Sequence, residues 1–220
     1  MGTSMMVNYK QSTDLDFAIV PGSGPVVQVA HPTSIGRNPI EMISLLIEVS
    51  FSRALPDEVE LLVTGGGFIE FDFGLTKLSR RQLREPAFLK DLHRWTLSNI
   101  YEVFRTIGRS PGLDLVVGVD VTVNGQIGVG QFATLISRDG VALVPKRLPV
   151  GGESNNLAGV DSTAIDRYPR VFNTRVGSTL VLVCHDVNSV NPRTPALIGR
   201  ASVPNARTQA IEELDRAFET

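Results

Sequence analysis

The spacing of apolar and polar residues changes along the chain and outlines the elements that we predict. Residues 25–31 are a short run rich in β-branched side chains, which predicts a strand. Residues 38–55 are apolar on most sides and begin with Asn-Pro, a combination typical of a helix start. Residues 59–64 predict a second strand, which a triple glycine ends, and residues 65–85 look irregular. We therefore expect a βαβ unit with parallel strands.

A long amphipathic segment follows. Residues 85–108 have Pro86 near their start and Gly108 at their end, which predicts a single long helix. Its mainly apolar stripe is formed by Phe88, Leu92, Trp95 and Leu97. This helix is the second one that we expect to cover the sheet.

The pattern then changes to short apolar runs separated by turn residues. Three strands are predicted at residues 115–121, 130–136 and 141–144. The Asn-Gly at 124–125 and the Asp-Gly at 139–140 are typical of tight turns between antiparallel strands. These residues therefore predict a β-meander.

The remaining segments complete the predicted fold. Residues 149–170 predict a coil, residues 178–183 a buried strand and residues 205–220 an amphipathic helix. The order of elements indicates an α/β protein with a mixed β-sheet and flanking helices. We expect one domain over residues 21–220, preceded by an N-terminal extension over residues 1–20 that is disordered or in part an expression-vector scar.

Composition excludes several classes of protein. The 220 residues carry a net charge of −2, which does not favour nucleic acid or an anionic membrane as the main partner. The first residues have no charged region followed by a long apolar stretch, so we expect no signal peptide. No apolar run reaches the roughly 20 residues that a transmembrane helix needs. A single cysteine excludes an internal disulfide and fits a reducing compartment, so we predict a cytoplasmic protein.

The one cysteine, Cys184, follows the strand predicted at residues 178–183. Ligand and catalytic groups of open α/β sheets gather at such strand ends, although a free cysteine is also a common core residue. Lys146 directly follows another predicted strand, and Glu153 follows a Pro-Gly loop. A lysine and a carboxylate near a thiol suit acyl transfer, whereas each alone is more often a solvated surface charge.

The neighbours of the cysteine do not indicate a metal site. Cys184, His185 and Asp186 are consecutive, and consecutive residues of a strand point to opposite faces. The other two histidines have no known ligand spacing, so we expect neither a metal nor another cofactor. The triple glycine lacks the lysine of a phosphate-binding loop.

Three segments together resemble a known family. Residues 130–153 contain a meander, an Asp-Gly hairpin and Lys146, and residues 170–186 contain "RVFNTRVGSTLVLVCHD" with Cys184 near the end. Residues 26–49 supply a first strand and helix. In this order and spacing they resemble the nitrilase superfamily of carbon–nitrogen hydrolases, over roughly residues 26–186.

The resemblance implies a fold, a reaction and roles for particular residues. It implies an αββα sandwich that forms homodimers or larger homo-oligomers and hydrolyses a small nitrile or non-peptide amide without a cofactor. Cys184 would be the nucleophile, Lys146 would stabilise the oxyanion, and Glu153 would orient the lysine or the substrate. His185 would contribute its backbone N–H group to substrate binding, and Asp186 would anchor the turn that presents the sulfur.

Two features depart from the family. Its general-base glutamate ends the second strand after a proline, where this chain has Gly65 and Gly66. Glu70 lies four residues after Gly66 and could reach the same pocket as a substitute base, and Gly66 would then line the substrate site. The chain also ends one predicted helix after the cysteine, so we expect a fragment, or a second sheet that is incomplete or completed by a partner. A catalytically inactive nitrilase-like module that binds a ligand or protein is the alternative.

Overall fold

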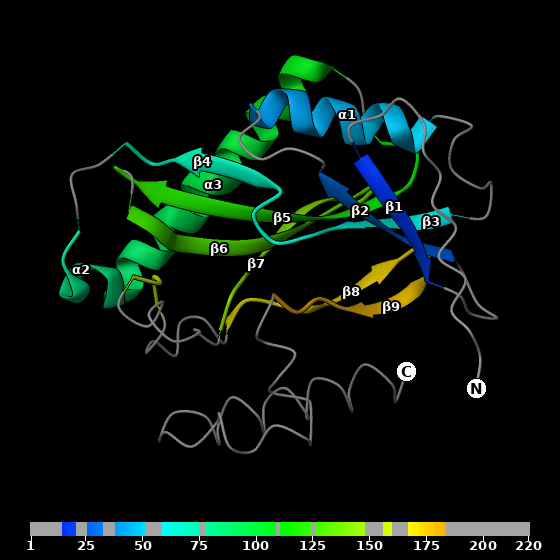
Figure 1. Cartoon of the computed structure of the whole chain (residues 1–220). Helices are drawn as coiled ribbons and strands as arrows, with labels where there is room; N and C mark the ends of the chain where they lie inside the picture. The colour runs from blue at the N-terminus through cyan, green and yellow to red at the C-terminus, as the bar shows by residue number, and fades with distance from the viewer. Residues whose placement is uncertain are drawn as a thin grey trace, which may run out of the picture.

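A computed structural model describes most of the chain between Leu15 and Val183 (Figure 1). For residues 15–20, 26–32, 126 and 127 it describes the backbone alone. The predicted helix at 205–220 and most of the predicted coil at 149–170 lie outside the described residues, which are 15–20, 26–32, 38–51, 59–74, 78–108, 111–124, 126–147, 156–159 and 167–183.

A mixed sheet, as the sequence predicts, forms the centre of the fold, and it has seven strands. The strand order is β1-β2-β3-β5-β6-β7, and β4 pairs with β5 beyond the end of β3. Neighbouring strands are parallel from β2 to β5 and antiparallel at both edges. The strands are β1 (Leu15–Val20), β2 (Val26–Pro32), β3 (Val59–Thr64), β4 (Ile69–Asp72), β5 (Asp114–Val123), β6 (Gln126–Ser137) and β7 (Gly140–Pro145).

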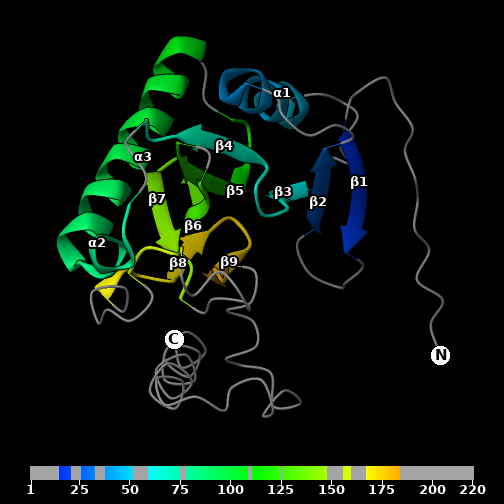
Figure 2. The ribbon, with the colours of Figure 1, turned by 60° about the vertical axis from the view of Figure 1, so that its left-hand side comes forward.

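Helices α1 (Pro39–Phe51) and α3 (Pro86–Ile107) cover one face of this sheet (Figure 2). The predicted start of α1 is confirmed, because the Asn38 side-chain oxygen accepts the N–H of Ile40 at 2.9 Å. The predicted end of α3 is also confirmed, because Gly108 adopts the left-handed conformation, with φ 66°, that glycine tolerates best. Local residues therefore fix the start of α1 and the end of α3.

Two apolar clusters lie on opposite faces of the sheet. The larger one joins α1 and α3 to alternate residues of β5, including Val117, Val119 and Val121, which are fully buried. The smaller one joins Ala133 and Val144 to two residues that follow the β8–β9 hairpin. The hairpin is formed by β8 (Val171–Thr174) and β9 (Gly177–Leu180). The described chain thus forms a helical layer, a large sheet and a small second sheet on the face away from α1 (Figure 1).

Residues 65–85 contain more regular structure than the sequence predicts. They include β4 and the short helix α2 (Arg80–Arg84), whose cap is the paired side chains of Ser79 and Gln82. Strands β3 and β4 run along β5 in the same direction, with Val63 opposite Val116 and Ile69 opposite Val119. The chain therefore advances six residues from Val63 to Ile69 while β5 advances three, from Val116 to Val119. The extra residues bulge out between β3 and β4, and they include the glycines at 65–67.

Three other predictions need correction. The strand predicted at 178–183 ends at Leu180 and belongs to the small sheet, so the strand does not lead directly to Cys184. The buried stripe of α3 consists of Leu89, Leu92, Thr96, Ile100 and Val103, because the helix packs on a face next to the predicted one. Leu15–Val20, within the predicted extension, forms β1 beside β2. No helix among the described residues is long and apolar enough to cross a membrane.

Candidate functional site

Four polar residues line up across the sheet on the face away from α1 and α3. Glu70 of β4 is opposite Asp120 of β5, which is opposite Gln131 of β6. The next residue in line is Lys146, directly after β7, whose backbone N–H donates to the Gln131 carbonyl at 2.8 Å. Directly opposed residues present their side chains on the same face. We call Glu70, Asp120, Gln131 and Lys146 the polar row.

Lys146 is held firmly within the polar row. Its side chain is buried, with 1% of the residue exposed, and its ammonium donates to the Gln131 side-chain oxygen at 2.6 Å. The backbone hydrogen bond joins the same two residues. The backbone bond therefore fixes the main chain of Lys146 beside β6, and the side-chain bond fixes its ammonium group. A short charge-assisted hydrogen bond of this kind is among the stronger ones in proteins.

Asp120 lies against the glycine loop, residues 65–67. A Cβ atom at Gly67 would be 3.1 Å from one Asp120 carboxylate oxygen. A Cβ atom at Gly118, two residues before Asp120 on the same face, would be 2.1 Å from the Gly65 carbonyl oxygen. The glycine loop can therefore rest on β5 only because position 118 has no side chain, and this packing brings the loop beside the Asp120 carboxylate.

Glu70 stands at the far end of the polar row. Strands lie about 4.8 Å apart, so the backbones of Glu70 and Lys146 are separated by about 14 Å, and those of Asp120 and Lys146 by about 10 Å. Glu70 is exposed, whereas Asp120 is partly buried. Of the two carboxylates, Asp120 is thus the nearer to the lysine and the better shielded from water.

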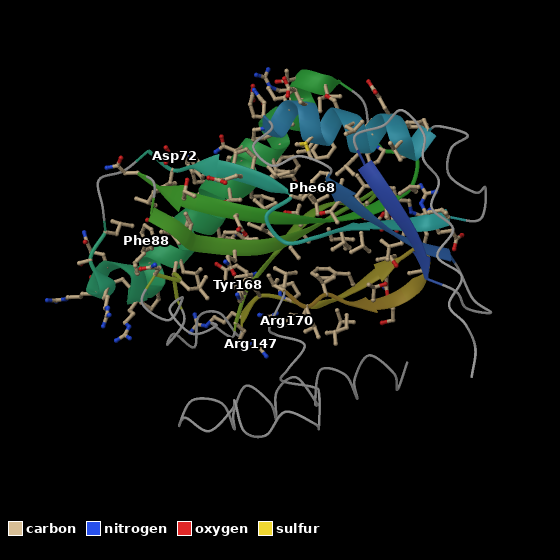
Figure 3. All side chains as sticks on the ribbon, viewed as in Figure 1. Phe68, Asp72, Phe88, Arg147, Tyr168 and Arg170 are labelled. Carbon is tan, nitrogen blue, oxygen red and sulfur yellow. The ribbon has the colours of Figure 1, made fainter. Side chains whose placement is uncertain are left out.

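Basic and aromatic residues surround the end of β7. Arg147 and Arg170 are both buried, with 5% and 2% exposed, and an Arg170 guanidinium nitrogen donates to the Pro145 carbonyl at 2.8 Å. Figure 3 shows both arginines on the side of the sheet away from α1. Tyr168 packs against the larger cluster. Together with Lys146 the arginines concentrate positive charge at one end of the strand, which favours anionic groups there.

His93 of α3 connects this region to the helical layer. Its ring lies 4.5 Å from the Tyr168 ring, and its Nε2 is 3.2 Å from the Leu143 carbonyl oxygen. A carbonyl only accepts, so Nε2 carries the proton in this contact. Burial lowers the pKa of His93, and the Leu143 hydrogen bond partly opposes that shift. Burial also raises the pKa of Tyr168, so both rings favour their neutral forms.

The structure brings two of the predicted site residues, Lys146 and Glu70, onto one face, with Asp120 and Gln131 between them. Gly66 is exposed, and a Cβ atom there would meet nothing within 4 Å. The other predicted site residues lie outside the described residues: Glu153, Cys184, His185 and Asp186.

The described chain runs up to the residue before the cysteine. Val183 is buried with Ala133 and Val144 in the smaller apolar cluster. Ala133 lies two positions from Gln131 on β6, and Val144 lies two positions from Lys146, so all four share one face of the sheet. Val183 therefore packs on the face of the sheet that carries the polar row.

Sequence reasoning missed Asp120 and Gln131, although the sequence carries a signal for both. Asp120 interrupts a run of valines in a strand whose other face is fully apolar. The Asn-Gly turn brings β6 back beside β5, and beyond a register shift between Val121 and Val123, Gln131 lies opposite Asp120. Charged residues inside such a strand are rare unless one face is functional or solvated.

Two further observations limit the site. Among the residues that the structure describes, no group of three or more histidine, cysteine, aspartate or glutamate side chains is placed to hold a metal ion. A hollow between the β6–β7 hairpin and Phe172 of β8 lies at the opposite end of the same face, away from the polar row.

Neither the models of known protein families nor the curated proteins contain a match to this chain.

Proposed function

We propose that this chain is a thiol-dependent carbon–nitrogen hydrolase that acts on a small nitrile or non-peptide amide. The observation that carries the proposal is the buried ammonium of Lys146, held 2.6 Å from Gln131 in a row that also contains carboxylates. A fixed cation in a shielded site stabilises negative charge that develops on a substrate oxygen or nitrogen. Cys184 follows Val183 in the chain and would supply the nucleophile.

The reaction has two stages. With an amide, the Cys184 sulfur attacks the carbonyl carbon, a carboxylate accepts the thiol proton, and Lys146 and the backbone N–H of His185 hold the oxyanion. The carboxylic acid then gives its proton to the departing nitrogen, and ammonia or an amine leaves behind a thioester. In the second stage the carboxylate takes a proton from water, and the hydroxide attacks the thioester. The product acid leaves, and the Cys184 thiolate takes the proton back from the enzyme's carboxylic acid.

A nitrile follows the same route with one additional water. The thiol adds across the carbon–nitrogen bond to form a thioimidate, and water then adds to the carbon and ammonia departs to leave the thioester. Glu153 would orient Lys146 or the substrate, and Asp186 would anchor the turn after the nucleophile. Gly66 would line the substrate site from the exposed part of the glycine loop.

The layers of the described chain support a nitrilase-like αββα sandwich as its fold. A helical layer covers one face of the large sheet, and the small sheet packs on the other through Val181 and Val183. These correspond to the first three layers of such a sandwich. We expect the protein to form a homodimer or a larger homo-oligomer in the cytoplasm, in which a partner subunit would complete the sandwich.

Release of ammonia from a panel of nitriles and small amides tests this proposal. We expect turnover by the wild type, loss of at least about 100-fold in kcat with Cys184→Ala, and a similar loss with Lys146→Met. Lys90→Met is the matched control, because Lys90 is an exposed lysine of α3, and its kcat should stay within about twofold of the wild type.

The competing proposal is a catalytically inactive module that binds a ligand or a protein. It is favoured by Gly66, which stands where the family has its base and has no side chain to act with. It predicts no turnover of any substrate in the panel by the wild type. Turnover that Cys184→Ala removes would exclude the inactive module, and turnover that Cys184→Ala leaves unchanged would exclude the thiol mechanism.

A further inference from the structure

We propose that the outer edge of β7 is a strand-pairing surface that His93 keeps closed, and that the same edge of a second copy of this chain pairs with it once it is open. Strand β7 is the last strand of the large sheet and lies beside α3 (Figure 2). An edge strand presents a row of backbone N–H and C=O groups on which another strand can form. The proposal goes beyond the hydrolase function and does not depend on it, because it involves no substrate and no thiol.

The register of β6 and β7 shows which backbone groups face outward. The Gln131 carbonyl accepts the Lys146 N–H, so these two residues form a hydrogen-bonded pair. In an antiparallel ladder such pairs alternate with pairs that are not hydrogen-bonded. The residues of β7 in pairs of the second kind are Val141, Leu143 and Pro145. Their backbone groups therefore point away from β6, toward the outer edge.

Two side chains and a proline cover part of this edge. The His93 Nε2 donates to the Leu143 carbonyl at 3.2 Å, and an Arg170 guanidinium nitrogen donates to the Pro145 carbonyl at 2.8 Å. Pro145 has no N–H group to offer. Both donors come from outside the sheet, His93 from α3 and Arg170 from the residue before β8. They confirm the outward direction of the two carbonyls, and they occupy acceptors that another strand would need.

The rest of the edge is open. Within the described part of the chain, no residue outside the sheet bonds to the N–H or C=O group of Val141, or to the N–H group of Leu143. The Val141 side chain is half-buried, so the strand remains close to the surface at this point. The Leu143 carbonyl is therefore the group of these two residues that His93 withholds from a neighbouring strand.

The outward groups of Val141 and Leu143 are complementary to the same groups in a second copy. An antiparallel pairing about a two-fold axis at Ala142 places Val141 of each copy opposite Leu143 of the other. Each of these residue pairs exchanges two hydrogen bonds, one of which is accepted by the Leu143 carbonyl. His93 therefore blocks half of the hydrogen bonds of the symmetric pairing. That loss keeps the edge closed in the wild type.

His93→Phe opens the edge and keeps an aromatic ring beside Tyr168 and Phe132. A freed acceptor is worth up to about tenfold in association, and the pairing gains one from each copy, so the dissociation constant for self-association should fall by about 10- to 100-fold. Sedimentation velocity at several protein concentrations measures this change against the wild type. Asn99→Leu is the matched control, because Asn99 is a half-buried residue of α3 whose side chain bonds the Trp95 carbonyl of the same helix. It makes α3 more apolar without freeing a strand carbonyl, and it should leave the dissociation constant unchanged.

A second substitution distinguishes symmetric pairing from nonspecific aggregation. Ala142 lines the hollow beside Phe172, which leaves room for a longer side chain. Ala142→Lys places two like charges opposite each other across the two-fold axis, which destabilises the pairing. Added to His93→Phe, it should return the dissociation constant to the wild-type value. Self-association of His93→Phe that Ala142→Lys leaves in place would overturn the proposal.

Backbone hydrogen exchange, followed by mass spectrometry, locates the contact. Exchange in the peptides that contain Val141 and Leu143 should slow when His93→Phe associates, and unchanged exchange there would overturn the proposal. Unchanged association of a folded His93→Phe protein would do the same. Urea unfolding, followed by the fluorescence of the single tryptophan, shows that each variant is folded. His93→Leu, a smaller replacement without a donor, must behave in the same way and takes the place of His93→Phe if that variant does not fold.

Discussion

Replacing Gly118 with alanine places a methyl group where the glycine loop crosses β5. The new Cβ atom would meet the Gly65 carbonyl oxygen at 2.1 Å and the Gly66 Cα at 2.7 Å, both of them backbone atoms. Position 118 itself is held by the hydrogen bond to Thr64 and by pairing with Ala133 of β6. The loop must therefore move away by about 1 Å or more to restore ordinary contact.

The expected cost combines two effects. Forcing an additional carbon into a packed region costs about 1–3 kcal/mol, and weakening the hydrogen bond to Thr64 adds about 1 kcal/mol. Gly118→Ala should thus lower the free energy of unfolding by about 2–4 kcal/mol. For a chain of this size the midpoint of thermal unfolding should fall by roughly 5–15 °C.

Urea unfolding followed by tryptophan fluorescence is the appropriate assay. The only tryptophan, Trp95 of α3, packs edge-on against Phe71 of β4 and against Phe73, at ring distances of 6.2 and 4.7 Å. Its emission therefore reports on the strand that follows the glycine loop. Gly66→Ala is the matched control, because a Cβ atom there meets nothing within 4 Å. It should change stability by no more than about 0.5 kcal/mol. Equal stability of Gly118→Ala and the wild type would refute this account of the loop.

Three more predictions concern the surroundings of the site. Gln131→Met removes the side-chain oxygen that accepts from Lys146 at 2.6 Å, and it should lower the free energy of unfolding in urea by about 1.5–3 kcal/mol. Asp114→Ala removes a carboxylate that accepts the Arg175 backbone N–H at 2.7 Å, and it should cost about 2 kcal/mol in the same assay, whereas no change would show that the β8–β9 turn does not depend on it. Burial lowers the pKa of His93, so the unfolded chain binds more protons than the folded one below the usual value of 6.5, and the folded protein should lose stability as pH falls from 6.5 through the lowered pKa. His93→Phe should flatten that part of a plot of urea midpoint against pH.

Much of the fold could be predicted because local residues specify it. Asn38 caps α1, Gly108 ends α3, and the Asn-Gly and Asp-Gly turns set the meander. The missed strand β4 has only four residues, and its pairing partner in β5 lies about 50 residues further along the chain. A pairing over such a separation leaves no local signal, and the preceding glycines suggest a loop.

The overextended strand has a different explanation. Val181 and Val183 continue the apolar run of β9, and the sequence therefore predicts a strand through residue 183. In the structure both side chains are buried in the smaller cluster, but regular pairing with β8 ends at Leu180. An apolar run reports burial reliably, whereas strand pairing also needs a partner with free backbone groups.

The candidate site shows the same division between local and non-local information. Lys146 could be identified because it is a charge directly after an apolar strand. The pairing of Asp120 with Gln131, and the contact between Asp120 and the glycine loop, depend on the register of several strands. The sequence therefore identifies Lys146, whereas the residues that surround it on the sheet emerge only from the strand pairing.

Trapping a covalent intermediate tests the central claim most directly. The wild type is mixed with an amide of the panel, quenched in acid within the first turnover, digested, and the peptide that contains Cys184 is weighed by mass spectrometry. We expect an adduct whose mass equals that of the amide minus ammonia, which is absent in Cys184→Ala and reduced in Lys146→Met. Turnover of the amide with no adduct on Cys184, or undiminished turnover by Cys184→Ala, would contradict the claim.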